Sequence, residues 1–127
     1  MQTIDYIGKP WQRGGFDCWA LVRMFYLNEL AVCLPMITAL DNANIKHILT
    51  EFEKSPVFSV FEKVEKPKNY DVVGFYFEGT KRLGHVGIFL ESSRSVLHCP
   101  FGGASVVQHL GLFERMNCIE GFYRYRV

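Results

Sequence analysis

The stretch Arg13-Gly14-Gly15-Phe16-Asp17-Cys18-Trp19-Ala20-Leu21-Val22 decides the fold, since a glycine-rich turn leads directly into an apolar run that starts at a cysteine. Asp17 is a favourable N-cap residue, because its carboxylate can accept a hydrogen bond from an unpaired backbone N–H of the first helical turn. The run that follows has few charges and is interrupted by Pro35. It predicts a largely covered helix from Cys18 to about Leu30, with the chain turning away before the proline.

Cys18 falls in the first turn of this predicted helix. The unpaired N–H groups and the positive end of the helix dipole favour a thiolate there, and the thiolate is the nucleophilic form of cysteine. We therefore expect Cys18 to react with thiol reagents faster than Cys33, Cys99 and Cys118. The irregular spacing of the four cysteines predicts reduced thiols, and we expect the other three to be buried small hydrophobic residues.

The composition predicts one folded domain over residues 1–127. Hydrophobic residues make up 49% of the chain and aromatic residues 15%, which is enough for a packed core. A net charge of +1 provides no strong field for nucleic acid or an anionic membrane, so we expect neither as a partner. The N-terminus lacks a signal-peptide pattern, and no apolar stretch approaches the roughly 20 residues of a membrane span, which predicts synthesis in the cytoplasm.

The segment before the β-rich half carries one more helix signal and one strand signal. Asp41 to Lys54 has apolar residues at helical spacing and charges elsewhere, which predicts an amphipathic surface helix. His47 lies on this helix, and we expect it on a solvated face without a catalytic role. Phe58 to Val64 could form a short strand.

From Tyr70 onward the sequence changes to strand-like runs separated by short turns. Short connections between consecutive strands predict an antiparallel meander. Helices first and strands second indicate an α+β fold, with N-terminal helices packed on an antiparallel sheet of about five strands. The predicted runs are Tyr70 to Phe77, Gly84 to Glu91, Ser95 to Cys99, Ala104 to Leu110 and Ile119 to Val127.

Two histidines in this sheet are candidates for assisting Cys18. Period-2 alternation puts His85 and Gly87 on one face of their strand, and Gly87 would leave room for a helix terminus or a substrate. A hairpin would bring His98, at the end of the next strand, across from the His85 region, where it could orient a catalytic imidazole. The alternative for His85 alone is a hydrogen-bonded, inert residue at a strand start.

A metal site built from Cys18, His85, His98 and Cys99 is the chief chemical competitor. The chain lacks the closely spaced ligand pairs that make zinc sites rigid, and alternation points Cys99 away from His98. We therefore expect no metal and no cofactor.

Trp11, Trp19 and Asp17 are the candidates for substrate contact. The alternative is core packing for the two tryptophans and a helix cap for Asp17. Asp71 has an ordinary interpretation as a turn former.

The motifs Gly-Gly-Phe-Asp-Cys-Trp-Ala-Leu-Val at 14–22, His-Val-Gly-Ile-Phe-Leu at 85–90 and Val-Leu-His at 96–98 resemble the catalytic motifs of the NlpC family of papain-like cysteine peptidases. The resemblance implies a papain-like NlpC-type fold and the catalytic set Cys18, His85 and His98. Tyr70-Asp71 resembles the family's Gly-Asp turn, with Tyr70 in place of the glycine.

Within the family, Ile7-Gly8-Lys9-Pro10-Trp11 and Asp17-Cys18-Trp19 most resemble the branch found in bacteriophage and prophage tail assembly proteins. The resemblance implies a peptidoglycan stem peptide as substrate, typically cut after a γ-linked D-glutamate, and other tail tip proteins as possible partners. It also implies a location in the host cytoplasm on synthesis and in the virion tail after incorporation. The alternatives are a processing peptidase for tail proteins and a catalytically idle structural component of a tail.

Overall fold

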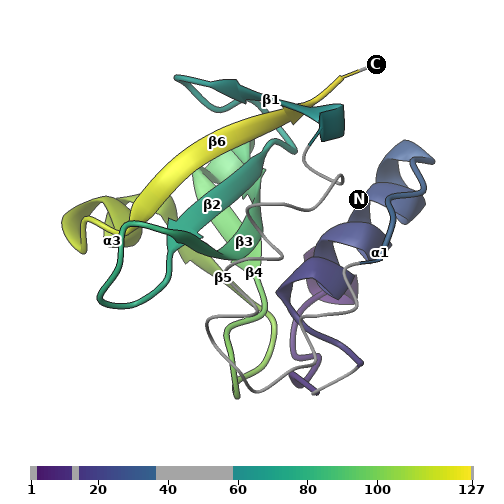
Figure 1. Ribbon diagram of the computed structural model, residues 1–127. Coiled ribbons are helices and arrows are strands. Elements are labelled where there is room, and N and C mark those ends of the chain that lie inside the picture. The colour runs from purple at the N-terminus through teal and green to yellow at the C-terminus, as the bar shows by residue number, and fades with distance from the viewer. Residues whose placement is uncertain (1–2, 13–14, 37–58, 127) are drawn as a thin grey trace.

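The computed structural model describes residues 3–12, 15–36 and 59–126 (Figure 1). A short 3-10 helix, η1 (Thr3–Asp5), precedes the turn that leads to helix α1 (Cys18–Leu30). The predicted helix from Asp41 to Lys54, and His47 with it, lies outside the described residues.

Helix α1 begins where the sequence predicts. The Asp17 carboxylate accepts a hydrogen bond from the backbone N–H of Ala20 at 2.8 Å, and the helix ends at Leu30, after which Ala31 adopts a left-handed conformation. One side of α1 is fully covered, whereas Leu27 and Leu30 are exposed. Asp17 therefore starts the helix, and the left-handed residue after Leu30 ends it before Pro35 is reached.

Six strands form one antiparallel sheet in the order β1-β6-β2-β3-β4-β5. The bounds of the strands are β1 (Phe61–Val64), β2 (Val72–Tyr76), β3 (Leu83–Leu90), β4 (Ser95–His98), β5 (Val106–His109) and β6 (Ile119–Tyr125). A 3-10 turn, η4 (Glu91–Ser93), joins β3 to β4. The predicted α+β fold with a helix on an antiparallel sheet is confirmed, with six strands.

The predicted meander is correct for β2 to β5 and wrong for the last strand. After β5 the chain forms helix α3 (Leu110–Arg115), which the sequence pattern had placed partly in a strand, and then returns across the sheet. Strand β6 inserts between β1 and β2, pairing Val64 with Phe122 and Val72 with Tyr123. Only long-range pairing could reveal this position, because α3 carries the chain away from its sequence neighbour β5.

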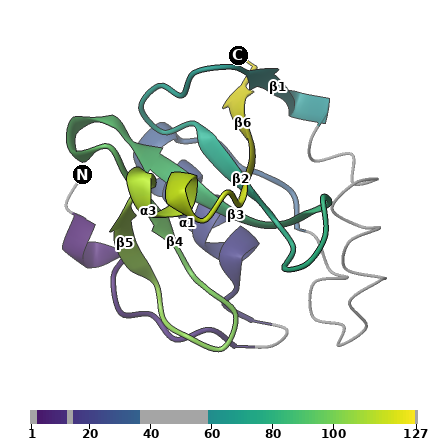
Figure 2. The ribbon, with the colours of Figure 1, turned by 90° about the vertical axis from the view of Figure 1, so that its left-hand side faces the viewer.

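The sheet lies between α1 and α3, as the two ribbon views show (Figure 2). Alternate residues of its strands therefore enter two cores. The core on the α1 side includes Cys18, Trp19, Val86, Ile88 and Leu97. The core on the α3 side includes Val73, Phe75, Phe89, Val96 and Phe113.

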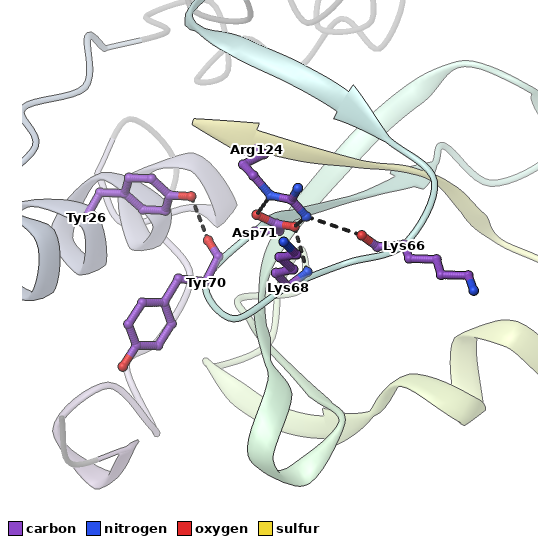
Figure 3. A network of polar contacts seen from close by, with 6 residues as sticks. All are labelled: Tyr26, Lys66, Lys68, Tyr70, Asp71 and Arg124. Carbon is purple, nitrogen blue, oxygen red and sulfur yellow. Dashed lines mark hydrogen bonds and ion pairs between the residues drawn. The ribbon is translucent and has the colours of Figure 1, made fainter. Parts of the chain in front are cut away.

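A polar network surrounds the turn that leads into β2 (Figure 3). Arg124 of β6 donates two hydrogen bonds to the Asp71 carboxylate, at 3.1 and 2.7 Å, and Asp71 also accepts the backbone N–H of Lys68. The Tyr26 hydroxyl of α1 donates to the backbone carbonyl of Tyr70 at 2.6 Å. The turn before β2 is thereby tied both to β6 and to α1.

No helix among residues 3–12, 15–36 and 59–126 is long and apolar enough to cross a membrane.

Candidate active site

Cys18 is the first residue of α1, and its thiol is almost fully covered, with 8% of the residue exposed. Burial, and to a smaller extent the neighbouring Asp17 carboxylate, raises the pKa of this thiol to about 12. The backbone N–H of Val86 lies against the sulfur and partly opposes the rise in pKa. Desolvation thus opposes the thiolate that the helix start favours, and it is the larger of the two effects on the pKa.

The contact with Val86 brings the thiol to the beginning of β3, one residue from His85. At this point the pairing of β2 with β3 is irregular: Phe75 is opposite His85 and Tyr76 is opposite Leu83, which leaves Gly84 as an extra residue. A Cβ at Gly84 would lie 2.5 Å from the Cβ of Phe77, so only glycine fits. Bulges of this kind bend a strand and re-aim its side chains, and this one sets the direction of His85.

His85 and His98 form a hydrogen-bonded pair on the side of the sheet that faces α3. The Nε2 atom of His85 lies 2.8 Å from the Nδ1 atom of His98. The register that permits this contact pairs His98 with Gly87, two residues from His85 on the same face. The predicted proximity of the two histidines across neighbouring strands is therefore confirmed.

The absence of a side chain at Gly87 serves a different purpose from the one expected, which was to admit a helix terminus or a substrate. A Cβ at this position would lie 2.7 Å from a Val96 methyl carbon and 2.9 Å from the Cβ of His98. The missing side chain therefore makes room for the side chains of β4, and in particular for the histidine that supports His85, rather than for a helix terminus.

Both histidines are neutral in this environment. Burial, with a smaller effect of His98, lowers the pKa of His85 to about 3. Burial also lowers the pKa of His98, while its hydrogen bond to Gln108 opposes that change. The resting site holds a neutral thiol and two neutral imidazoles in place of the thiolate–imidazolium pair that a helix-start cysteine suggests.

Sequence reasoning missed three residues around the pair. The Nε2 atom of His98 lies 2.6 Å from the Oε1 atom of Gln108 on β5. The ring of Phe75 lies 5.3 Å from that of His85, and the ring of Phe113 lies 5.3 Å from that of His98. A glutamine directly after the apolar pair that starts β5 was the available signal, but its partner depends on strand register.

The residues predicted to contact substrate have distinct environments. Trp19 is 2% exposed, belongs to the core on the α1 side and donates its indole N–H to the Pro35 carbonyl. Trp11 is partly exposed, and its ring lies 4.4 Å from that of Phe101, which is 76% exposed. Asp17 caps α1, and burial raises the pKa of its carboxyl group.

All four cysteines lie in the described part of the chain and are free thiols. Cys99 is buried as expected and Cys118 is half-buried, but Cys33 is exposed because it follows the end of α1. Cys99 packs in the core on the α1 side, the opposite face from His98. Within residues 3–12, 15–36 and 59–126, no three His, Cys, Asp or Glu side chains are grouped so that they could hold a metal ion.

These features describe an α+β domain with a cysteine at a helix start and a histidine pair on adjoining strands of an antiparallel sheet. The chain belongs to the NlpC/P60 family, whose sequence profile matches residues 6–115. Members of this family are typically cysteine peptidases and act on peptidoglycan peptides.

One similar solved structure is the NlpC/p60 domain of the peptidoglycan hydrolase SagA. Its sequence is 21% identical to this chain, the match covers 98% of this chain and 92% of that one, and the TM-score is 0.58. At this identity the likeness concerns the fold. No curated protein matches the chain.

Proposed function

We propose that this domain is a cysteine peptidase that hydrolyses an amide bond in peptidoglycan stem peptides, with Cys18 as nucleophile, His85 as base and His98 as the residue that orients His85. The observation that carries the proposal is the bond of 2.8 Å between His85 and His98, at the strand whose Val86 N–H touches the Cys18 thiol. A nucleophile that touches the strand of a base, and an orienting group beside that base, are the parts of a covalent hydrolase.

The reaction begins from neutral groups. Burial disfavours a lone charge on Cys18 or on His85, whereas a thiolate and an imidazolium that form together attract one another. The thiol proton passes to His85 as the sulfur attacks the amide carbonyl, and the backbone N–H of Cys18 can stabilise the resulting oxyanion. His85 then protonates the leaving amine, and water hydrolyses the thioester.

The bond that we propose is the one after a γ-linked D-glutamate in the stem peptide. The family's action on peptidoglycan peptides supports the substrate class. The SagA domain, of the same fold, comes from a peptidoglycan hydrolase, which agrees with this class. The partly exposed contact between the tilted rings of Trp11 and Phe101 is the candidate surface for contact with the peptide.

The setting that we propose is a bacteriophage or prophage tail tip, or its assembly, with synthesis in the host cytoplasm. Its support is the likeness of the segments around Trp11 and Cys18 to tail proteins. Processing of tail proteins is a second role for the same chemistry. The near-complete burial of the Cys18 thiol favours a further candidate, an idle structural component of a tail.

The test is to incubate purified peptidoglycan with the wild type, with Cys18→Ala and with Cys33→Ala, and to identify the released fragments by mass spectrometry. We expect new amino termini from the residue after D-glutamate with the wild type and Cys33→Ala, and none with Cys18→Ala. Release by all three proteins would contradict the role of Cys18. Release by none would favour the structural candidate.

A further inference from the structure

Gln108 is the last member of a chain of hydrogen bonds that crosses three neighbouring strands. His85 of β3 contacts His98 of β4 at 2.8 Å, and His98 contacts Gln108 of β5 at 2.6 Å. Both steps are diagonal in the sheet, since His98 is paired with Gly87 and Gln108 is paired with Val96. Each step therefore joins residues on the same face of adjacent strands.

The atom that Gln108 presents determines the direction of every bond in this chain. The Oε1 atom of an amide can only accept, so the Nε2 atom of His98 must carry the proton. A neutral His98 then has a lone pair on Nδ1, which accepts a hydrogen bond from the Nε2–H of His85. A neutral His85 in turn keeps its own lone pair on Nδ1.

The surroundings of His98 help to keep this arrangement neutral and fixed. His98 is 4% exposed, and its ring lies edge-on to Phe113, with Phe75 on the side of His85. Gly87 leaves the space that the Cβ of His98 occupies. Because the neighbouring aromatic rings offer no strong hydrogen-bond acceptor, the acceptor at position 108 decides the tautomer of His98.

We propose that Gln108 is a positioning residue that holds His98 and His85 in their Nε2–H tautomers, which leaves Nδ1 of His85 as the atom that receives the Cys18 proton. This inference rests on the proposed function for its chemical purpose. The hydrogen-bond directions follow from the orientation of the Gln108 amide, with Oε1 toward His98, and can be tested without any substrate.

The first test is a two-bond proton–nitrogen NMR spectrum of protein labelled with ¹⁵N at histidine, recorded at pH 8. We expect Nε2–H tautomers for His85 and His98 in the wild type, and loss of this fixed pattern in Gln108→Met, which removes the acceptor at similar volume. Gln108→Glu keeps an acceptor oxygen, and we expect it to restore the pattern. The variant His109→Asn, at the next residue, keeps a side chain that can cap α3 and serves as the control.

Two results would overturn the inference. Nδ1–H tautomers for both histidines in the wild type would mean that Gln108 donates to His98. An unchanged wild-type pattern in Gln108→Met would mean that Gln108 does not select the tautomer. Either result can be obtained whether or not the protein cuts peptidoglycan. A failure of this inference can therefore be told apart from a failure of the proposed function.

The second test is kinetic, on whichever stem-peptide fragment the wild type cleaves. We expect Gln108→Met to lower kcat by about 10- to 100-fold, as loss of an orienting partner commonly does, with KM within about twofold. Gln108→Glu recovers most of kcat at pH 8, and His109→Asn matches the wild type. Equal losses of kcat in Gln108→Met and Gln108→Glu would indicate a packing role and contradict the assignment.

Discussion

The Cys18 thiol combines a helix start, which favours the thiolate, with burial, which disfavours it more strongly. Because Cys18 is 8% exposed and Cys33 is an exposed residue, exposure favours an order of reactivity opposite to the one expected from sequence. We now expect iodoacetamide at pH 7 to modify Cys33 before Cys18, and modification of Cys18 to accelerate as the pH rises toward its pKa of about 12.

Peptide mapping by mass spectrometry at several pH values measures both rates. Peptidase activity should survive modification of Cys33 and disappear in step with modification of Cys18. A Cys18 that reacts first, at a rate already constant below pH 7, would show a thiolate at rest and contradict the neutral site.

Tyr70 occupies a backbone conformation that usually requires glycine. Its φ is +71°, in the left-handed region, at the position where the family motif has glycine. Its ring packs edge-on against Phe25, with 5.0 Å between ring centroids, which offsets some of the strain. Comparing Tyr70→Gly with Tyr70→Ala separates the two effects, because both variants lose the ring and only glycine relieves the backbone.

We expect Tyr70→Gly to be more stable than Tyr70→Ala by about 1 kcal/mol in urea unfolding. In an ordinary strand or helix alanine is the more stable of the two, so the sign of the difference is diagnostic. An alanine variant that equals or exceeds the glycine variant in stability would rule out strain at this turn.

The strand β6 is held at its unexpected place by the ion pair between Arg124 and Asp71. The Asp71 side chain is 5% exposed, and Arg124 contacts both of its carboxylate oxygens (Figure 3). Removing the guanidinium leaves a buried carboxylate without its charged partner, which is costly. The ion pair of Lys63 with Glu120 also involves β6, but Lys63 is 57% exposed.

We therefore expect Arg124→Met to lower the urea midpoint by at least twice as much as Lys63→Met. The exposed pair contributes less than about 1 kcal/mol. Circular dichroism during urea titration gives both midpoints. Equal, small losses would show that the Asp71 network does not anchor β6.

The elements differ in how far the sequence predicted them. Helix α1 was predictable at its first residue because the Asp17 cap and the apolar run are local signals. Helix α3 could not be predicted from the sequence, because it is six residues long, contains Gly111 and is capped by a histidine, His109. The position of β6 in the sheet could not be predicted from the sequence either, because it depends on pairing with strands distant in sequence.

The residues of the candidate site also differ in whether the sequence could predict them. Motif spacing was enough to select Cys18, His85 and His98 as candidates, and the structure joins the two histidines. The role of Gln108 could not be predicted, because two strand registers must be known before its side chain meets His98. Burial of Cys18 is likewise a property of the assembled layers, and it overrides the local effect of the helix dipole.

The folded molecule as a whole should be destabilised by mild acid through its buried histidines. An unfolded histidine binds a proton below its ordinary pKa of 6.5, whereas His85 in the folded state does so only near 3. Between these values the unfolded state binds more protons, so stability falls as the pH falls. The lowered pKa of His98 acts in the same direction.

We expect the free energy of unfolding of the wild type to fall between pH 6 and pH 4 more steeply than that of His85→Gln. The difference in slope for one histidine is at most about 1.4 kcal/mol per pH unit. Urea unfolding at several pH values measures it, with His109→Asn as the control at an exposed histidine. Identical slopes for the wild type and His85→Gln would contradict a neutral, buried His85.

The whole molecule is proposed to work through one covalent step, the formation of a thioester on Cys18. The most direct measurement is rapid acid quenching of the wild type during turnover of a peptidoglycan fragment, followed by mass spectrometry of its cysteine-containing peptides. We predict an acyl group on Cys18 that hydroxylamine removes, and neither acylation nor product with Cys18→Ala. An acyl group on Cys33, Cys99 or Cys118 in its place, or hydrolysis that persists in Cys18→Ala, would contradict the account.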